Sequence, residues 1–434
     1  MVNQQKYTHQ VVIIGGGAAG IMVASQLRSQ DRSLDIAIIE PSSLHHYQPG
    51  WTLIGGGVFK PEQTIRRQKD LIPQGTAWIQ DKVITLDPDR NRVVTAQGKQ
   101  INYQYLIVCP GIQIDWHLIE GLKETLGKNG VTSNYAKDCA PYTWETIQSF
   151  KGGRAIFTYP ATPIKCGGAP QKIMYMADDI FKGKSSVGTN TEILFCSADT
   201  KMFTVPEYSQ VLDQVVERRG ITVKYQYNLK AVRGDRHEAI FERITPNGVE
   251  EICLQYDMLH VAPPMSAPNF IKESPLSNGT AGGWVEVNPE TLQHQRYANI
   301  FGLGDASSLP TSKTAAALRG QAPILVANLL SLIHAQPLTA KYDGYTCCPV
   351  ITGYNSVMLA EFDYQKKPIS SFPLDPTKER YLMWLVKCYL LPWLYWHRML
   401  KGKPFEKQVL ADWKARLLKP KTLNTVELNT GILR

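Results

Sequence analysis

The sequence predicts an α/β protein made of two Rossmann-like domains in tandem, followed by an amphipathic helical C-terminal region. A glycine-rich loop directly follows an apolar strand near the N-terminus, and a strand that ends in Gly-Asp occurs much later, at residues 300–305. The 434 residues are 43% hydrophobic and 20% charged. A chain of this size and composition buries a large core and divides into two or three domains, so extensive disorder is not expected.

The first element is a nucleotide-binding unit. Val11 to Ile14 reads as a buried strand, residues 15–20 (GGGAAG) form the loop, and Ile21 to Arg28 reads as a helix. Asp35 to Ile39 is a second strand, closed by Glu40. Glycines let the backbone approach a pyrophosphate at the helix N-terminus, and an acid about 20 residues further on accepts ribose hydroxyls.

The late Gly-Asp strand favours FAD over NAD as the nucleotide. In flavoproteins with two dinucleotide-binding domains, the Asp of such a strand, here Asp305, binds the ribityl chain of FAD. A long helix is expected from Thr314 to Ile333, with Lys313 at its start. A helix N-terminus and a lysine there stabilise the negative charge of a reduced flavin.

The second α/β unit has lost its own glycine loop. Strands are expected at Ala155 to Tyr159 and Thr191 to Cys196, with a helix at Ala169 to Phe181 between them. The connection after the first strand reads PATPIKC (160–166), in which prolines replace glycines and supply no N–H donors. A nicotinamide site is therefore not expected. We predict an FAD-binding domain at 1–114 plus 293–340, a second domain at 115–292 and a C-terminal region at 341–434.

Several strings between residues 10 and 355 carry a family resemblance. They are HYQPGWT (46–52), KCGGAPQK (165–172), PPM (263–265), LPTSKTAAA (309–317), YDGYT (342–346), CP (348–349) and TGYN (352–355). In combination they resemble sulfide:quinone oxidoreductases, in the branch that includes the mitochondrial enzymes. The resemblance implies FAD as cofactor, sulfide as electron donor and a quinone as acceptor, with glutathione, sulfite or polysulfide as sulfur acceptor.

The resemblance also implies site residues. Cys166 and Cys348 match the redox-active pair: Cys348 keeps the persulfide and Cys166 leaves as a thiolate placed to attack the flavin at C4a. Lys165 and the helix start near Ala169 are expected to lower the pKa of Cys166. The positions matched or expected at the FAD site are Gly15, Gly16, Gly17, Ala19, Gly20, Glu40, Gln48, Val83, Gly111, Asp305 and Lys313.

The remaining cysteines mostly fit a structural role. Tyr135 stands where many bacterial relatives have a third essential cysteine, and Cys139 is offset from it by four. Cys347 is interpreted as a bystander, with a role beside Cys348 as the alternative, and Cys253 is expected in the core. The absence of CxxC and HExxH strings argues against a zinc site. Glu207 is a candidate base by position only.

The C-terminal region carries the net charge of +9. Residues 366–434 contain 14 Lys and Arg against five Asp and Glu, and no nucleic-acid recognition module accompanies them. Residues 381–400 combine aliphatic residues with six Tyr and Trp but are interrupted by Lys387 and Pro392. We expect two short interfacial helices broken near Pro392, with a further amphipathic stretch at 406–418, and peripheral membrane docking. Homo-oligomer contacts or core packing are the alternative roles.

The N-terminus lacks the apolar segment of a signal peptide, which favours the cytoplasmic or matrix face of the inner membrane. Two other functions stay open from the sequence: a type II NADH:quinone oxidoreductase, which shares the fold, and a flavoprotein without catalytic activity that acts as a redox sensor.

Overall fold

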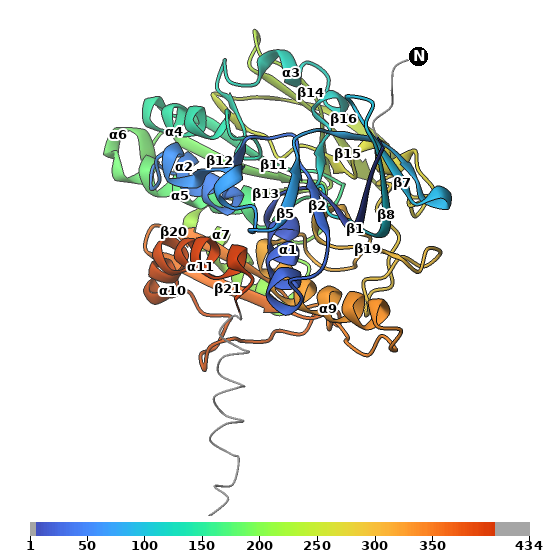
Figure 1. The fold of residues 1–434 in the computed structure, drawn as a ribbon. Helices are drawn as coiled ribbons and strands as arrows, with labels where there is room; N and C mark the ends of the chain where they lie inside the picture. Colours follow the sequence, from blue (N-terminus) through green and yellow to red (C-terminus); the bar gives the residue numbers. More distant parts are fainter. Residues whose placement is uncertain (1–5, 404–434) are drawn as a thin grey trace, which may run out of the picture.

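The computed structural model describes residues 6–403, and residues 6–108 together with 300–302 build a seven-stranded sheet around the predicted glycine loop (Figure 1). Its order is β5-β2-β1-β8-β7-β6, with β19 parallel to β8. At the centre of the sheet, residues 11–14 of β1 pair with residues 36–39 of β2, and both segments are aliphatic and buried, as is typical of parallel strands covered on both faces. The strands are β1 (Lys6–Ile14), β2 (Ile36–Ile39), β5 (Thr76–Ile79), β6 (Val83–Asp87), β7 (Arg92–Thr95), β8 (Gln100–Val108) and β19 (Ile300–Gly302).

Two helices flank this sheet. Helix α1 (Ala18–Gln30) packs against α9 (Ala315–Ile333). Among the described residues, α9 is the one helix long and apolar enough to cross a bilayer by length and composition. Its contacts with α1 and with strand β20 (Thr346–Gly353) give a packing reason for that composition. Both helices begin within a few residues of the positions expected from the sequence.

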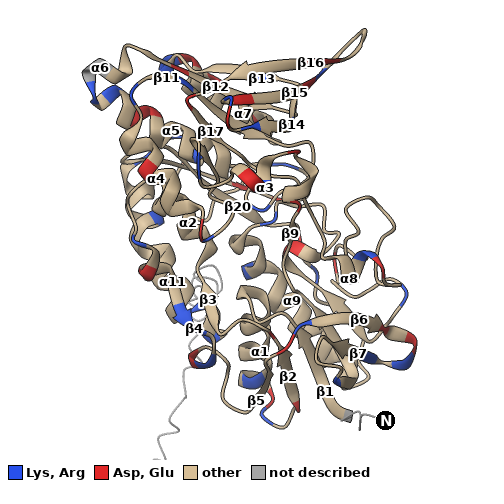
Figure 2. Cartoon of the chain, turned by 90° about the horizontal axis from the view of Figure 1, so that it is seen from above, with Lys and Arg blue, Asp and Glu red and all other residues tan. Residues whose placement is uncertain are grey.

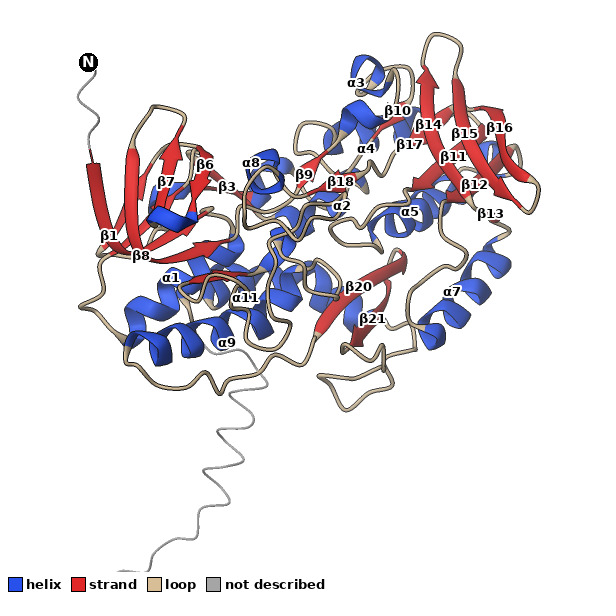
Figure 3. Ribbon diagram, turned by 90° about the vertical axis from the view of Figure 1, so that its right-hand side faces the viewer, coloured by secondary structure: helices blue, strands red, loops and turns tan. Residues whose placement is uncertain are grey.

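A second sheet of five parallel strands follows, in the order β10-β17-β11-β12-β13 (Figure 3). These strands are β10 (Val131–Thr132), β11 (Gly153–Tyr159), β12 (Thr191–Ser197), β13 (Thr222–Tyr225) and β17 (Met258–His260). The helices of this part are α4 (Ala140–Ser149), α5 (Ala169–Gly183), α6 (Ser185–Gly188) and α7 (Pro206–Arg219). An antiparallel meander sits at its end: β14 (Tyr227–Arg233), β15 (Glu238–Thr245) and β16 (Gly248–Gln255).

Cys253 corrects one expectation, because it is exposed on β16 rather than buried. The meander packs one face on the domain, and the side chain of Cys253 lies on the solvent side of that alternation.

The C-terminal region is a hairpin, β20 (Thr346–Gly353) with β21 (Ser356–Phe362), followed by a helical run (Figure 1). The run consists of α10 (Tyr381–Leu385), a π-helical turn (Val386–Leu390) and α11 (Leu391–His397). Near Pro392, where a break is expected, a π turn separates the two short α-helices, and the proline is the second residue of α11. The expected stretch at 406–418 lies outside the described residues.

Short elements connect these parts. They are β3 (Leu44–His46), β4 (Ile65–Arg67), α2 (Trp51–Gly55), β9 (Gln113–Ile114), α3 (Leu122–Thr125), β18 (Met265–Ser266) and α8 (Asn269–Lys272). The pair β9–β18 crosses between the first and second predicted domains, while each larger sheet draws its strands from within one of them. The domain boundaries themselves stay a prediction.

Candidate active site

The glycine loop and Glu40 form one hydrogen-bonded unit. The amide of Gly16 donates to Glu40 Oε2 at 2.8 Å, while Oε1 accepts from the amide of Ser42 at 2.8 Å. Gly15 has a φ of +101°, and a Cβ there would lie 2.5 Å from the carbonyl oxygen of Cys109. A Cβ added to Gly17, the N-cap of α1, would have no neighbour within 4 Å. The loop therefore leaves open space in front of a helix N-terminus.

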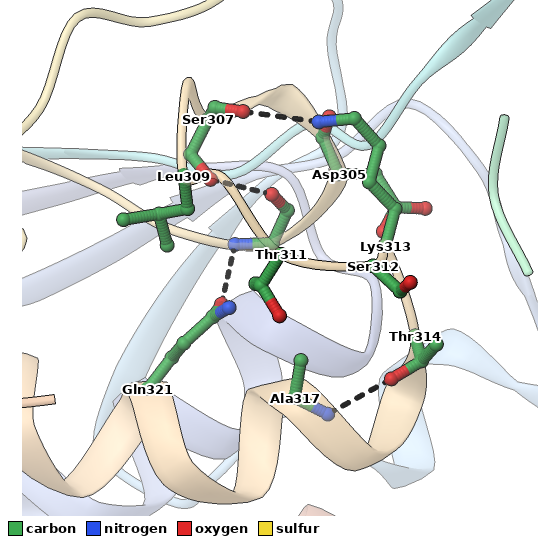
Figure 4. Close-up of a pocket in the computed structure, with 10 residues that line it drawn as sticks. Asp305, Ser307, Leu309, Thr311, Ser312, Lys313, Thr314, Ala317 and Gln321 are labelled. Atoms are coloured by element: carbon green, nitrogen blue, oxygen red, sulfur yellow. Dashed lines mark hydrogen bonds between the residues drawn. The ribbon is translucent and has the colours of Figure 1, made fainter. Parts of the chain in front are cut away.

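The strand that ends in Gly-Asp leads into the start of α9 (Figure 4). Thr314 caps α9, and its Oγ1 accepts from the amide of Ala317 at 3.0 Å. The Lys313 Nζ donates to the carbonyls of Asp305 (2.7 Å) and Ser307 (3.0 Å). Burial lowers the pKa of Lys313 to about 8 and raises the pKa of the Asp305 carboxyl.

A large cavity connects these two places. It contains about 1850 Å³ of space and opens to solvent. Of the predicted FAD positions, those that line it are Gly16, Gly17, Ala19, Glu40, Gln48, Gly111, Asp305 and Lys313. Gly15 and Gly20 form the part of the loop that faces away from the cavity. Val83 is buried in β6 and is not among the residues that line the cavity.

Cys166 lines this cavity, and Cys348 lies directly behind it. Their sulfur atoms lie 3.8 Å apart although 182 residues separate them in the chain. Cys166 has a φ of +51°, in the left-handed region that non-glycine residues rarely adopt. Two backbone hydrogen bonds hold it there: its amide donates to the carbonyl of Lys313 (2.9 Å), and its carbonyl accepts from the amide of Ala169 (2.8 Å). Cys166 is thus tied to the same loop that carries Lys313.

Lys172 is the cation that acts on the pair. Its Nζ donates to Cys166 Sγ at 3.1 Å, from a buried position one turn into α5. The hydrogen bond from the Cys348 thiol, together with the ammonium of Lys172, holds the pKa of Cys166 well below its usual value despite burial. The same hydrogen bond, with burial, raises the pKa of Cys348. Cys166 is therefore the thiolate of the two.

Lys165 does not have the role expected for it. Its Nζ donates to Gln48 Oε1 at 2.9 Å and lies 4.8 Å from the centre of the Trp51 ring. The side chain points away from the sulfur, toward α2. The sequence contains a signal that could have indicated Lys172 instead, since it follows the helix N-cap at Gly168 by one turn and lies on the same helix face.

Other cysteines and Tyr135 surround the pair differently. The Tyr135 hydroxyl donates to the carbonyl of Cys166 at 3.4 Å, so the residue at the third-cysteine position supports the backbone of Cys166. Cys347 lines the large cavity, and burial raises the pKa of its thiol. Cys139 is half-buried and precedes α4. Glu207 is exposed in the first turn of α7.

The C-terminal helices complete the cavity wall. Lys387 and Leu391 line the cavity together with Tyr395. The Lys387 Nζ donates to the carbonyl of Pro49 at 2.9 Å, and burial lowers its pKa to about 8. The hydroxyl of Tyr395 lies 2.6 Å from Nε2 of the buried His45, whose pKa burial lowers to about 4. Figure 2 shows α11 beside β3 and β4, where these contacts occur.

Three polar side chains face the cavity without a partner among the described residues. Asn134 has neither amide atom paired, and His46 Nδ1 and Trp51 Nε1 are likewise unpaired. Buried polar atoms without partners are rare in native proteins and indicate a ligand. Together with the open face of Gly17 and the helix N-termini, they fit a long molecule with a phosphate end and a polar ring, as FAD is.

A smaller cavity of about 440 Å³ reaches Cys348 from the other side. It lies at the carboxyl ends of β11 and β12, where Tyr159 and Ser197 line it, and Lys201 supplies a positive charge. In open α/β sheets this edge is where ligands bind. The two sulfurs therefore stand between two cavities.

Comparison with known proteins agrees with this geometry. Residues 9–141 match the family model described as pyridine nucleotide-disulphide oxidoreductase. A mitochondrial sulfide:quinone oxidoreductase of Dictyostelium discoideum is 48% identical over 93% of this chain and 89% of its own length. The corresponding protein of Mus musculus is 45% identical over 92% and 87%. The crystal structure of the Aquifex aeolicus sulfide:quinone oxidoreductase superposes with a TM-score of 0.77 at 21% identity, covering 94% and 95% of the two chains, and shows the same fold.

The fold and the site define an FAD-dependent flavoprotein oxidoreductase of the disulfide type. Within that class, the chain belongs to the sulfide:quinone oxidoreductase family. The family assignment confirms the fold class, the cofactor and the enzyme class expected from the sequence, and it favours neither of the two other functions considered there.

Proposed function

We propose that this protein oxidises sulfide at the Cys166–Cys348 pair and delivers the two electrons through bound FAD to a membrane quinone. The observation that carries the proposal is the 3.8 Å separation of the two sulfur atoms at the wall of the flavin-sized cavity. A disulfide needs sulfurs about 2.05 Å apart, so the present separation of 3.8 Å is longer than a direct bond and leaves room for one inserted sulfur atom.

The sulfur step is a thiol–disulfide exchange. Hydrosulfide attacks the Cys348 sulfur of the bridge, a new S–S bond forms on Cys348, and the bond to Cys166 breaks. Cys348 then carries the persulfide, and Cys166 leaves with the electron pair as a thiolate. Lys172 stabilises that charge through its hydrogen bond to Cys166 Sγ.

Bound FAD would supply the two-electron acceptor for Cys166 and the donor for the quinone, and transfer of the sulfane sulfur from Cys348 to its acceptor would free Cys348 to re-form the bridge with Cys166. The residues that would hold FAD are the glycine loop and Glu40 at the ribose and pyrophosphate, and Asp305 and Lys313 near the ring end. Lys313 and the N-terminus of α9 supply positive charge there.

We propose that the quinone enters from the lipid along the C-terminal helices. The helical run 381–397 is inverted relative to a soluble surface helix: Lys387 points inward and is 3% exposed. Large apolar side chains point outward, with exposed fractions of 59% for Tyr381, 70% for Tyr389 and 52% for Trp393. Exposed aromatic and aliphatic side chains on one helical surface suit the membrane interface. The same helices line the cavity.

The smaller cavity suits the sulfur acceptor. It reaches Cys348, which carries the persulfide in the proposed exchange. Its lining includes Lys201, which can pair with an anion such as sulfite or a carboxylate of glutathione, and also the carboxylate of Asp199. Sulfide and the sulfane sulfur thus both reach Cys348 through the smaller cavity, while FAD and the quinone use the large one. The relatives named mitochondrial support a mitochondrial location. We propose that the protein lies as a peripheral protein on the matrix face of the inner membrane.

The test is anaerobic addition of sulfide to the flavin-loaded protein while flavin absorbance is recorded. Rapid bleaching is expected for the native chain and for Cys347→Ser, the matched control next to Cys348. Bleaching should be lost in Cys166→Ser and Cys348→Ser with FAD still bound. Sulfide-dependent bleaching that survives both substitutions would refute the proposal, and bleaching by NADH alone would favour the type II NADH:quinone oxidoreductase.

A further inference from the structure

Helix α5 and strand β20 lie side by side and hold the two sulfurs at one end (Figure 3). Cys166 lies just before α5, and Cys348 is the third residue of β20. From Ala169 to Asp178, α5 rises about 14 Å at 1.5 Å per residue. From Cys348 to Thr352, β20 rises about 13 Å at 3.3 Å per residue. Measured from the sulfurs, Asp178 in α5 and Thr352 in β20 therefore lie at about the same height along the two elements.

At that level, Arg219 of α7 joins the two elements. Its Nη1 donates to Asp178 Oδ2 (2.6 Å) and Asp179 Oδ1 (2.7 Å), both on α5. Its Nη2 donates to the carbonyl of Thr352 in β20 at 2.6 Å. The other oxygen of Asp179 accepts from the amide of Tyr354, in the hairpin turn, at 2.6 Å. One guanidinium and one carboxylate thus tie the helix to the hairpin.

Charge and burial make this junction rigid. Asp178 is 2% exposed and Arg219 14%. Lys182 adds a second cation, since its Nζ lies 2.9 Å from Asp178 Oδ1 and donates to the carbonyl of Arg219 at 2.7 Å. Two carboxylates therefore face two cations, and the hydrogen bonds to an ionised group are among the stronger ones in proteins.

β20 and the α5 side come close together at two points, and a glycine lies at each of them. A Cβ on Gly168 would lie 2.6 Å from Cys348 Sγ. At the other end, a Cβ on Gly353 would collide with the guanidinium of Arg219 and lie 2.7 Å from Asp179 Oδ2. The absence of a side chain at these two points lets the strand lie close against α5 at the sulfurs and at the junction.

We propose that Arg219, through Asp178 and Asp179, is a positioning residue that sets the separation of Cys166 and Cys348 by fixing the register of β20 against α5. A slip of β20 by one residue moves it about 3.3 Å, nearly the whole of the present gap between the sulfurs. The junction also explains the TGYN string at 352–355, whose backbone supplies the hairpin side of the contact. This inference rests on the proposed redox role of the cysteine pair.

The experiment measures how readily the pair forms a bridge, without using sulfide. Flavin-loaded protein is equilibrated anaerobically in mixtures of oxidised and reduced dithiothreitol, and alkylation with mass spectrometry gives the bridged fraction. In the exchange, the two protein thiols become a disulfide while oxidised dithiothreitol takes up the electrons and protons. The variants are Arg219→Gln and, as matched control, Arg218→Gln, which removes an exposed ion pair to Glu379 that does not involve α5.

Arg219→Gln is expected to lower the bridging constant about tenfold, which corresponds to a potential about 30 mV less negative. Arg218→Gln should stay within twofold of the native chain. Lys182 still neutralises Asp178 in Arg219→Gln, so folding is expected. If that variant does not fold, Gly353→Ala keeps every charge while pushing the junction apart, and the same loss is expected.

Equal bridging constants for Arg219→Gln and Arg218→Gln would overturn the inference, even if Arg219→Gln melts at a lower temperature, because a purely structural residue changes stability without changing the potential. For Gly353→Ala the corresponding refuting result is a native bridging constant. These results are separate from the proposed function, which fails only if the cysteine variants keep sulfide-dependent bleaching.

Discussion

Replacing Lys172 by Met should raise the pKa of the Cys166 thiol. The Nζ lies 3.1 Å from Cys166 Sγ in a buried setting. A hydrogen bond to a charged group contributes about 1.5–3 kcal/mol. At 1.36 kcal/mol per pKa unit, removing it should raise the thiol pKa by about one to two units. The direction follows from the charge, because the ammonium favours the thiolate over the neutral thiol.

The measurement is the rate of alkylation of Cys166 against pH, followed on its own peptide by mass spectrometry. A Cys348→Ala background removes the side-chain donor that also contacts Cys166. In that background, Lys172→Met should slow alkylation near neutral pH roughly tenfold or more and shift the profile to higher pH. Lys165→Met is the matched control, since its ammonium contacts Gln48. Superimposable profiles for the two lysine variants would show that Lys172 does not set the charge of the sulfur.

Three further outcomes are expected. Gly16→Ala should cost most of the bound FAD, measured as the ratio of flavin to protein absorbance, because a Cβ there would lie 2.7 Å from the side chain of Glu40; full flavin content would contradict this. Trp393→Glu should weaken sedimentation with anionic lipid vesicles several-fold while leaving sulfide-dependent bleaching intact, and unchanged vesicle binding would argue against the lipid-facing surface. Lys201→Gln should raise the KM for sulfite in steady-state turnover without slowing the first reduction by sulfide, and an unaltered KM would remove Lys201 from the acceptor path.

The parts of the fold that local chemistry dictates could be predicted from the sequence. A glycine loop between an aliphatic strand and a helix has few alternatives, and Glu40 at the end of the next strand meets the loop as expected. The tail was harder to predict. A proline in an apolar run predicts a break, but Pro392 lies in the first turn of α11 and the irregularity appears as a π turn.

The site residues that escaped prediction reach the cavity through tertiary packing. In the sequence, Lys387 interrupts an apolar segment and would be expected to face solvent. In the structure its side chain is buried and faces inward. Asn134 follows the short strand β10 and has no motif around it. The direction of Lys165 depends on Trp51, which a local pattern does not place next to it. Contacts between segments far apart in the chain carry no periodic signal, so these roles become visible only in three dimensions.

The position of Lys387 has a practical consequence for anyone who trims this protein to obtain a soluble form. The segment with the exposed aromatic side chains also lines the large cavity, and the Lys387 hydrogen bond to Pro49 holds it there. A chain that ends before residue 381 is therefore not expected to keep an intact site. Such a truncation would remove Lys387, Leu391 and Tyr395 from the cavity lining and widen the access of water to the sulfur pair. It would also remove one of the cations that favour the thiolate of Cys166.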